Sequence, residues 1–318
     1  TCALPILMRK RIISKTIDLL RDIYEDEEKR DSFYSQFSKN LKLGVYEEEK
    51  HREKLAGLLR FYTTTSGNNM RGLDEYIETM KEGQKSVYYL AGESMESVQR
   101  SVFLEALRAK GYEVLFMVDT IDEYMVQQLK SYKDYEFVSV AQEGLNFGDE
   151  DNKTSEGDAK ADKDGDADKD GNADGDVNGD TGEKVGGDGV EEEERNKELC
   201  TFFKDTLGDR VERVVVSKRI VQSPVCLVSG KFGWSANMER IMTAQAFGDN
   251  HMHQFMKSRK IMEINPNHKV IQSMYRKYGV NKEDRSLKDS VLLLYDVACM
   301  SCGFKVENVD VFSNTFYK

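Results

Sequence analysis

The chain has 318 residues, of which 39% are hydrophobic and 10% aromatic, enough to supply the cores of two domains. No run approaches the roughly 20 apolar residues that span a bilayer, and five scattered cysteines do not suit a small secreted disulfide scaffold. From these two observations we expect a soluble protein of a reducing compartment. The net charge is -11, and no basic stripe for nucleic acid is implied.

The acidic charge is concentrated between residues 149 and 194. This segment holds 19 Asp and Glu residues against 5 Lys, with nine glycines and no aromatic residue. Because such a composition cannot bury enough apolar area to offset the entropy of ordering, we expect a disordered acidic linker. It separates a first domain at 1–148 from a second at 195–318, and both are nearly neutral.

Helices are expected at the start of the first domain. Apolar residues recur at helical spacing from Ile13 to Tyr24 and again from Leu55 to Tyr62. Two or three packed helices are therefore predicted before the first strand.

A β-α-β unit is predicted next. Ser86 to Ala91 has a strand pattern, a helix follows from Met95 to Lys110 and ends at Gly111, and 113–118 is a second apolar strand. The two strands should be parallel. A helix through Tyr124 to Leu129 and a strand at Phe137 to Val140 continue the pattern.

The second domain should open with an antiparallel strand pair, Val211 to Val221 and Val225 to Lys231, joined by a turn at 222–224. Helices should follow. Ser286, with Asp289 three residues on, predicts a capping box, and the helix after it is apolar on too many faces for a one-sided stripe. We expect that helix to be buried, within the domain or between subunits. The predicted fold class is thus α/β and α+β.

The linker contains a partial calcium-loop pattern. Asp166, Asp168, Asp170 and Gly171 match the first six positions of an EF-hand loop, but the twelfth position is Val177, where bidentate coordination needs Glu. A solvated acidic spacer is the favoured interpretation. An acidic calcium-binding adaptor protein is the alternative.

Two further patterns have a functional and a structural interpretation. Cys299 and Cys302 form a CxxC that could exchange disulfides, but they end an apolar helix, which favours small buried side chains over a thiol oxidoreductase. His251 and His253 alternate, so on a helix they point apart and do not suit a metal site. No phosphate-binding glycine loop or nucleophile elbow is present, so we expect no catalytic site, metal or cofactor in this chain.

Several segments resemble the heat shock protein 90 chaperones, in that family's order. They are KNLKLG (39–44), LLRFYT (58–63), LDEY (73–76), IDEY (121–124), VSKR (216–219), FGWSANMERIM (232–242), EINP (263–266) and SCGF (301–304). The run around Trp234 is the most specific. The resemblance implies that 1–148 is the late part of a middle domain and 195–318 a dimerisation domain.

The resemblance also implies the function. Such chaperones bind unfolded or partly folded client proteins, work with cochaperones as homodimers, and hydrolyse ATP with Mg²⁺ in an N-terminal domain that does not precede Arg9 here. The sequences of residues 112–119 and 228–240 are most similar to those of the plastid and mitochondrial members. We therefore expect an organelle interior, with the cytoplasm as alternative. Thr1 to Leu7 does not resemble the family. Lys318 falls inside the last helix of the expected dimer interface, so weakened dimerisation is expected.

Client-binding and dimerisation residues follow from pattern and resemblance together. Asn250 to Lys260 is predicted to be an amphipathic helix whose Met and Phe face contacts clients or packs on its own domain. The expected client-binding residues are Met252, Phe255 and Met256, extended by Trp234, Met238 and Met242. The expected dimerisation residues are Leu287, Val291, Leu294, Tyr295 and Ala298.

Overall fold

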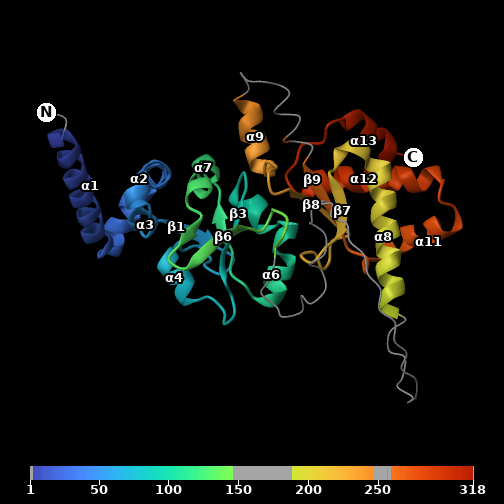
Figure 1. Ribbon diagram of the computed structural model, residues 1–318, viewed down its shortest axis with the longest axis horizontal. Helices are drawn as coiled ribbons and strands as arrows, with labels where there is room; N and C mark the ends of the chain where they lie inside the picture. The colour runs from blue at the N-terminus through green and yellow to red at the C-terminus, as the bar shows by residue number, and fades with distance from the viewer. Residues whose placement is uncertain (1–2, 146–187, 246–255, 257–258, 318) are drawn as a thin grey trace, which may run out of the picture.

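The computed structural model of the chain describes residues 3–145, 188–245, 256 and 259–317. Figure 1 shows an elongated arrangement, with helix α1 (Ala3–Tyr24) at one end, a mixed sheet in the middle, and a second sheet with its helices at the other end. In this part of the chain no helix is long and apolar enough to cross a membrane.

The first elements are helical, as predicted. After α1 comes α2 (Glu27–Glu47), which Asp26 caps by accepting a hydrogen bond from the Lys29 amide at 3.2 Å. A short turn, η1 (Glu49–His51), leads into α3 (Arg52–Ala56). The helix predicted over 55–62 is wrong beyond Ala56, because the chain turns at Gly57 and enters strand β1 (Arg60–Thr63), where alternate side chains are buried.

The described residues of the first half form a six-stranded sheet of order β2-β1-β4-β3-β6-β5. Its central strand β3 (Ser86–Ala91) is parallel to both β4 (Leu115–Met117) and β6 (Tyr135–Ser139). This confirms the predicted β-α-β unit. The remaining elements of this half are β2 (Arg71–Gly72), α4 (Leu73–Glu78), α7 (Thr120–Gln128) and β5 (Ser131–Tyr132).

The crossover between β3 and β4 is not the single helix predicted. It consists of α5 (Met95–Gln99), the turn η2 (Val102–Leu104) and α6 (Glu105–Lys110). Ser101 starts the new turn, because its hydroxyl accepts a hydrogen bond from the Phe103 amide at 3.3 Å. Gly111 ends α6 with a φ of +69°, as predicted.

A three-stranded sheet of order β7-β9-β8 forms the centre of the second half as described. β7 (Arg213–Val216) is parallel to β9 (Lys260–Ile264), and β8 (Val225–Ser229) is antiparallel to it. The prediction that the first two strands pair directly is therefore wrong. All of β9 is buried, including two charged residues. Lys260 forms an ion pair with Glu239, and Glu263 forms one with Arg219.

Helices surround this second sheet. α8 (Asp188–Leu207) begins inside the segment predicted to be disordered, so 188–194 is helical, and the acidic residues of this first part suit a helix N-terminus. The rest of the predicted linker lies outside the described residues. The other elements are η3 (Gly208–Arg210), α9 (Ala236–Ala244), α11 (Lys269–Val280), α12 (Arg285–Ser301) and α13 (Val309–Phe316).

The start of α12 also differs from the prediction. Its cap is Asp284, whose carboxylate accepts a hydrogen bond from the Ser286 amide at 2.9 Å, so Ser286 lies inside the helix. The capping box predicted at Ser286 is wrong by two residues.

One hydrophobic core is shared by the two halves. It joins Phe103, Leu104 and Leu107 to Phe203 and Ile220, and continues through the second sheet to α12. A second core lies between the first helices and the first sheet. The division into domains at 148 and 195 stays a prediction, but on either side of it the packing is continuous.

Candidate functional site

A groove of about 710 Å³ lies between α7 and β6 on one side and the loop from β8 to α9 on the other. Its lining combines aromatic, methionine and aliphatic side chains, namely Val126, Phe137, Phe232, Trp234, Met238 and Met256. Polar side chains complete the lining at Glu123, Gln127, Lys130, Glu136 and Lys231. The groove therefore offers both apolar contact and polar partners.

The loop that carries Phe232 is held by backbone contacts. The Gly230 amide donates to the Arg259 carbonyl at 2.8 Å, and the Gly233 amide donates to the Gly230 carbonyl at 2.9 Å. A Cβ on Gly233 would lie only 2.9 Å from the Arg259 carbonyl oxygen, so a side chain there would displace the loop. The result is a fixed turn that leaves Phe232 67% exposed.

Ser235 joins this loop to the opposite side of the groove. Its hydroxyl accepts a hydrogen bond from the Met238 amide at 3.0 Å, which caps α9, and donates one to Glu123 on α7 at 2.8 Å. Desolvation raises the pKa of Glu123, and hydrogen bonds from Ser235 and Asn237 offset this only in part. The start of α9 is thereby fixed against α7.

The predicted client-binding residues are only partly brought together. Met256 and Trp234 are half-buried and line the groove; Met238 also lines it but is buried, which fits a core role better than a surface one. Met242 is half-buried and outside the groove lining. Met252 and Phe255 lie outside the described residues. The predicted helix does not reach Lys260, which begins β9.

Sequence reasoning missed Phe232 and Phe137 as groove residues. Phe232 was quoted only within a family motif, although an aromatic residue between glycines in a turn signals an exposed ring. Phe137 was predicted as part of a strand, and no local pattern shows which face of that strand would meet a loop nearly a hundred residues away.

The predicted dimerisation residues lie mostly inside the chain's own core. Leu287, Val291, Tyr295 and Ala298 are buried in the shared core, and Leu294 is half-buried against it. This leaves them little surface for a second protomer. The large exposed apolar side chains of the same region are instead Val297, Met300, Val309, Val311, Phe316 and Tyr317.

The CxxC cysteines are buried thiols. Burial raises the pKa of Cys299 to about 11 and that of Cys302 to about 12, which disfavours the thiolate that exchange requires. The Leu227 amide donates to Cys302 Sγ at 3.2 Å. These findings confirm the interpretation as small buried side chains and weigh against a thiol oxidoreductase.

The two patterns that suggest a metal site, the histidines at 251 and 253 and the partial calcium loop, both lie outside the described residues. Within 3–145, 188–245, 256 and 259–317, no group of three or more His, Cys, Asp or Glu side chains is arranged to hold a metal ion.

Comparison with known proteins decides the family. The sequence model of the Hsp90 protein family matches residues 4–318, so the expectation that residues 1–7 do not match the family is wrong from residue 4 onward. The chain belongs to the Hsp90 family. It is 37% identical over 302 residues to heat shock protein 83 of Leishmania donovani, covering 95% of this chain and 60% of that protein.

Plant members of the Hsp90 family are equally similar. Heat shock protein 90-5, chloroplastic, of Arabidopsis thaliana is 39% identical over 317 residues, covering 98% of this chain and 36% of that protein. Heat shock protein 90-6, mitochondrial, of the same plant is 38% identical over 304 residues, covering 95% and 34%. The chain thus spans from about a third to three fifths of these relatives, and their near-equal identities do not distinguish an organellar type.

Among solved structures, the middle domain of a Plasmodium falciparum heat shock protein is 39% identical, with a TM-score of 0.42, and the match covers 43% of this chain and 57% of that one.

Proposed function

We propose that this Hsp90 chain supplies the client-binding part of a molecular chaperone, which holds unfolded or partly folded proteins. The observation that carries the proposal is the groove beside Phe232 and Trp234. Methionine and aromatic side chains adapt to apolar segments of different shape, which suits a binder of many partners better than a specific enzyme pocket.

The polar side of the groove suits an extended polypeptide. Lys130 and Lys231 are exposed cations on opposite walls, and Glu136 adds an exposed carboxylate on the wall formed by α7 and β6. An unfolded segment carries both apolar side chains and unpaired backbone groups, so a mixed lining can satisfy both. Cochaperones are proposed as further partners, on the support of the family alone.

ATP and Mg²⁺ are proposed to act in a part of the full-length protein outside this chain. The support is the greater length of the relatives and the lack of a phosphate-binding loop motif here. An ATPase assay on the purified chain should give no saturable hydrolysis, and saturable hydrolysis would contradict the proposal.

A homodimer is proposed through the exposed apolar side chains of α12 and α13. Phe316 and Val309 on α13 are each more than 60% exposed, and Met300 on α12 is about half exposed. Exposed apolar side chains on neighbouring helices favour contact with a second copy.

An organelle interior, the plastid stroma or the mitochondrial matrix, is proposed as the compartment. The support is the likeness to relatives named chloroplastic and mitochondrial. Fractionation of the source cells with antibody to this chain would test it, and a signal confined to the cytosol would contradict it.

The client proposal is tested by Phe232→Ser in the full chain. Because Phe232 is exposed, the substitution should change the free energy of unfolding by less than about 0.5 kcal/mol. Suppression of the aggregation of heat-denatured malate dehydrogenase, followed by light scattering, should fall. Val280→Ser, which removes an exposed apolar side chain at the end of α11, is the matched control. Equal suppression by Phe232→Ser and the unmodified chain would contradict the proposal.

A further inference from the structure

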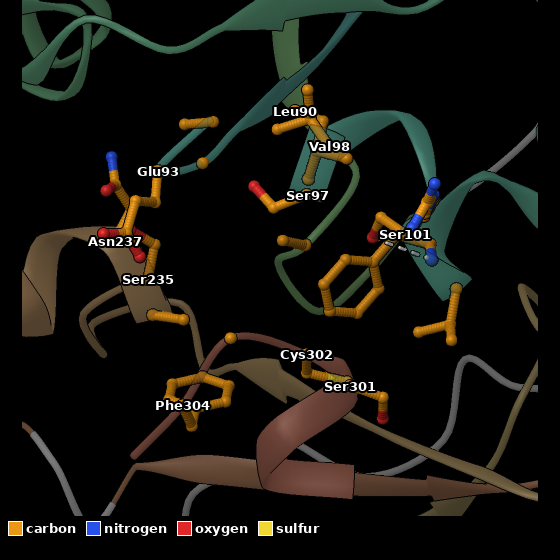
Figure 2. Close-up of a pocket in the computed structure, with 18 of the residues that line it drawn as sticks. Leu90, Glu93, Ser97, Val98, Ser101, Ser235, Asn237, Ser301, Cys302 and Phe304 are labelled. Atoms are coloured by element: carbon orange, nitrogen blue, oxygen red, sulfur yellow. Dashed lines mark hydrogen bonds between the residues drawn. The ribbon is translucent and has the colours of Figure 1, made fainter. Parts of the chain in front are cut away.

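A second cavity, of about 370 Å³, lies where three distant segments meet. Figure 2 shows it enclosed by the end of β3 and α5 above, by the start of α9 on the left, and by the end of α12 below. It shares Ala91, Ala141 and Ser235 with the groove, and its other lining residues are different.

Two opposite walls of the cavity are apolar and held by core packing. Leu90, Val98 and Phe103 come from the first half, and Cys302 and Phe304 from the second, and all five are buried in the shared core. Figure 2 shows Leu90 and Val98 on one side of the space and Phe304 and Cys302 on the other. Because these residues are fixed by packing, the cavity is a preformed apolar space.

The mouth of the cavity is polar and carries a cation. Arg240 on α9 donates to Asn237 Oδ1 at 3.0 Å and lies 3.4 Å from Glu93 Oε1, across the opening. Glu93 is 68% exposed, so this ion pair can exchange its carboxylate for another anion at little cost. Ser97, Ser101 and Ser301 also line the space.

We propose that this cavity binds a small molecule that has an apolar body and one anionic group, such as an aryl carboxylate or sulfonate. The volume falls within the range of about 300–1,000 Å³ that small-molecule sites show. The apolar body would lie against Phe103 and Phe304, and the anion would pair with the Arg240 guanidinium, which binds such groups through two parallel hydrogen bonds. This cavity is proposed as a binding site whether or not the groove binds clients.

The test uses a matched pair of fluorescent probes on the full chain: dansylate, which carries a sulfonate, and dansylamide, its neutral analogue. Arg240→Gln should weaken dansylate binding about two- to fivefold, the range expected for a partly exposed charge contact, and leave dansylamide binding unchanged. Glu93→Gln removes the competing carboxylate and should tighten dansylate binding. Arg276→Gln makes the same charge change on an exposed face of α11 and is the control.

A second variant fills the space. Ala236, the first residue of α9, lines the cavity beside Gly303, and Ala236→Leu should abolish binding of both probes. The melting temperature of Ala236→Leu shows whether this variant stays folded. If it does not, the test depends on Arg240→Gln and Glu93→Gln, which change partly exposed positions. Opposite responses of these two variants, with no response to Arg276→Gln, support the site. No saturable dansylate binding, or the same binding in every variant, would overturn it.

Discussion

Glu105, at the start of α6, accepts hydrogen bonds from the backbone amides of Val221 and Gln222, both at 2.7 Å, in the loop between β7 and β8. The amide and hydroxyl of Ser223 donate to the same carboxylate. One side chain of the first half therefore orders a turn of the second half. Beside it, the Ala106 amide donates to the Arg219 carbonyl at 3.1 Å.

Glu105→Ala should destabilise the chain by about 1–3 kcal/mol, because several donors lose a charged acceptor at once. Urea unfolding followed by circular dichroism measures the change. Glu96→Ala is the control, because Glu96 is exposed and pairs with the exposed Arg100, so its loss should cost less than about 0.5 kcal/mol. Equal costs for the two variants would show that the turn does not depend on Glu105.

The same carboxylate predicts a pH dependence. Desolvation raises the pKa of Glu105, but hydrogen bonds from Ser223 and the loop amides outweigh it, so the pKa lies below its ordinary value of 4.5. A lowered carboxyl pKa contributes stability above the unfolded value and loses it as the pH falls through the folded value. The stability difference between the unmodified chain and Glu105→Gln should thus be constant above pH 4.5 and shrink below it. A difference that grows on acidification would contradict this.

Arg219 and Glu263 form a buried pair within the second half, and Arg219 also contacts the first half. Arg219 Nη2 lies 2.9 Å from Glu263 Oε1, and Arg219 Nη1 donates to the Val140 carbonyl at 2.5 Å. Glu263→Gln should cost about 3–5 kcal/mol, because it leaves a buried charge without its partner. The double variant Arg219→Met with Glu263→Met should cost less than Glu263→Gln alone. Additive losses in urea unfolding would contradict this account of the pair.

This pair also explains why β9 was not predicted. Local signals were sufficient for the β-α-β unit, where apolar strands alternate with a helix that Gly111 ends. β9 contains Lys260 and Glu263 among apolar residues, and such a pattern indicates a buried strand only when partners distant in sequence are known. The groove was not predicted for the same reason, because Phe137 and Phe232 come together only when the two halves pack.

Lys42 on α2 is buried against α7, with its Nζ 2.7 Å from Asp119 Oδ2 and 2.8 Å from Asp122 Oδ1. Desolvation raises the pKa of Asp122, and the charge of Lys42 opposes that rise. In Lys42→Met this opposition is lost, so the pKa of Asp122 should rise further. A carboxyl whose folded pKa is raised gives stability that declines as the pH rises through that value.

Lys42→Met should therefore lose about 3–5 kcal/mol near neutral pH, and part of this loss should return as the pH is lowered toward 4. Urea unfolding at a series of pH values measures it. Lys39→Met is the matched control, because Lys39 lies 3.9 Å from Asp119 but is exposed. A pH-independent loss in Lys42→Met would show that packing, rather than the unpaired carboxyl, causes the destabilisation.

The last prediction concerns self-association through α12 and α13. Residues first expected at a dimer interface, such as Val291 and Tyr295, are buried in the chain's own core, so substituting them would test folding rather than association. Val309 and Phe316 are exposed instead, and Phe312 and Phe316 stack with centroids 6.1 Å apart. Burying such a face in a symmetric contact removes apolar area from water twice.

The double variant Val309→Glu with Phe316→Glu should shift the chain toward monomer. Sedimentation velocity at micromolar concentrations should show concentration-dependent association of the unmodified chain, and a single monomeric species for the variant. Its melting temperature should change little, because both positions are exposed. Val280→Glu, at an exposed position on α11, should leave association unchanged and serves as the control. If the unmodified chain stays monomeric, or if the double variant associates as strongly as Val280→Glu, then α13 does not form the contact between copies.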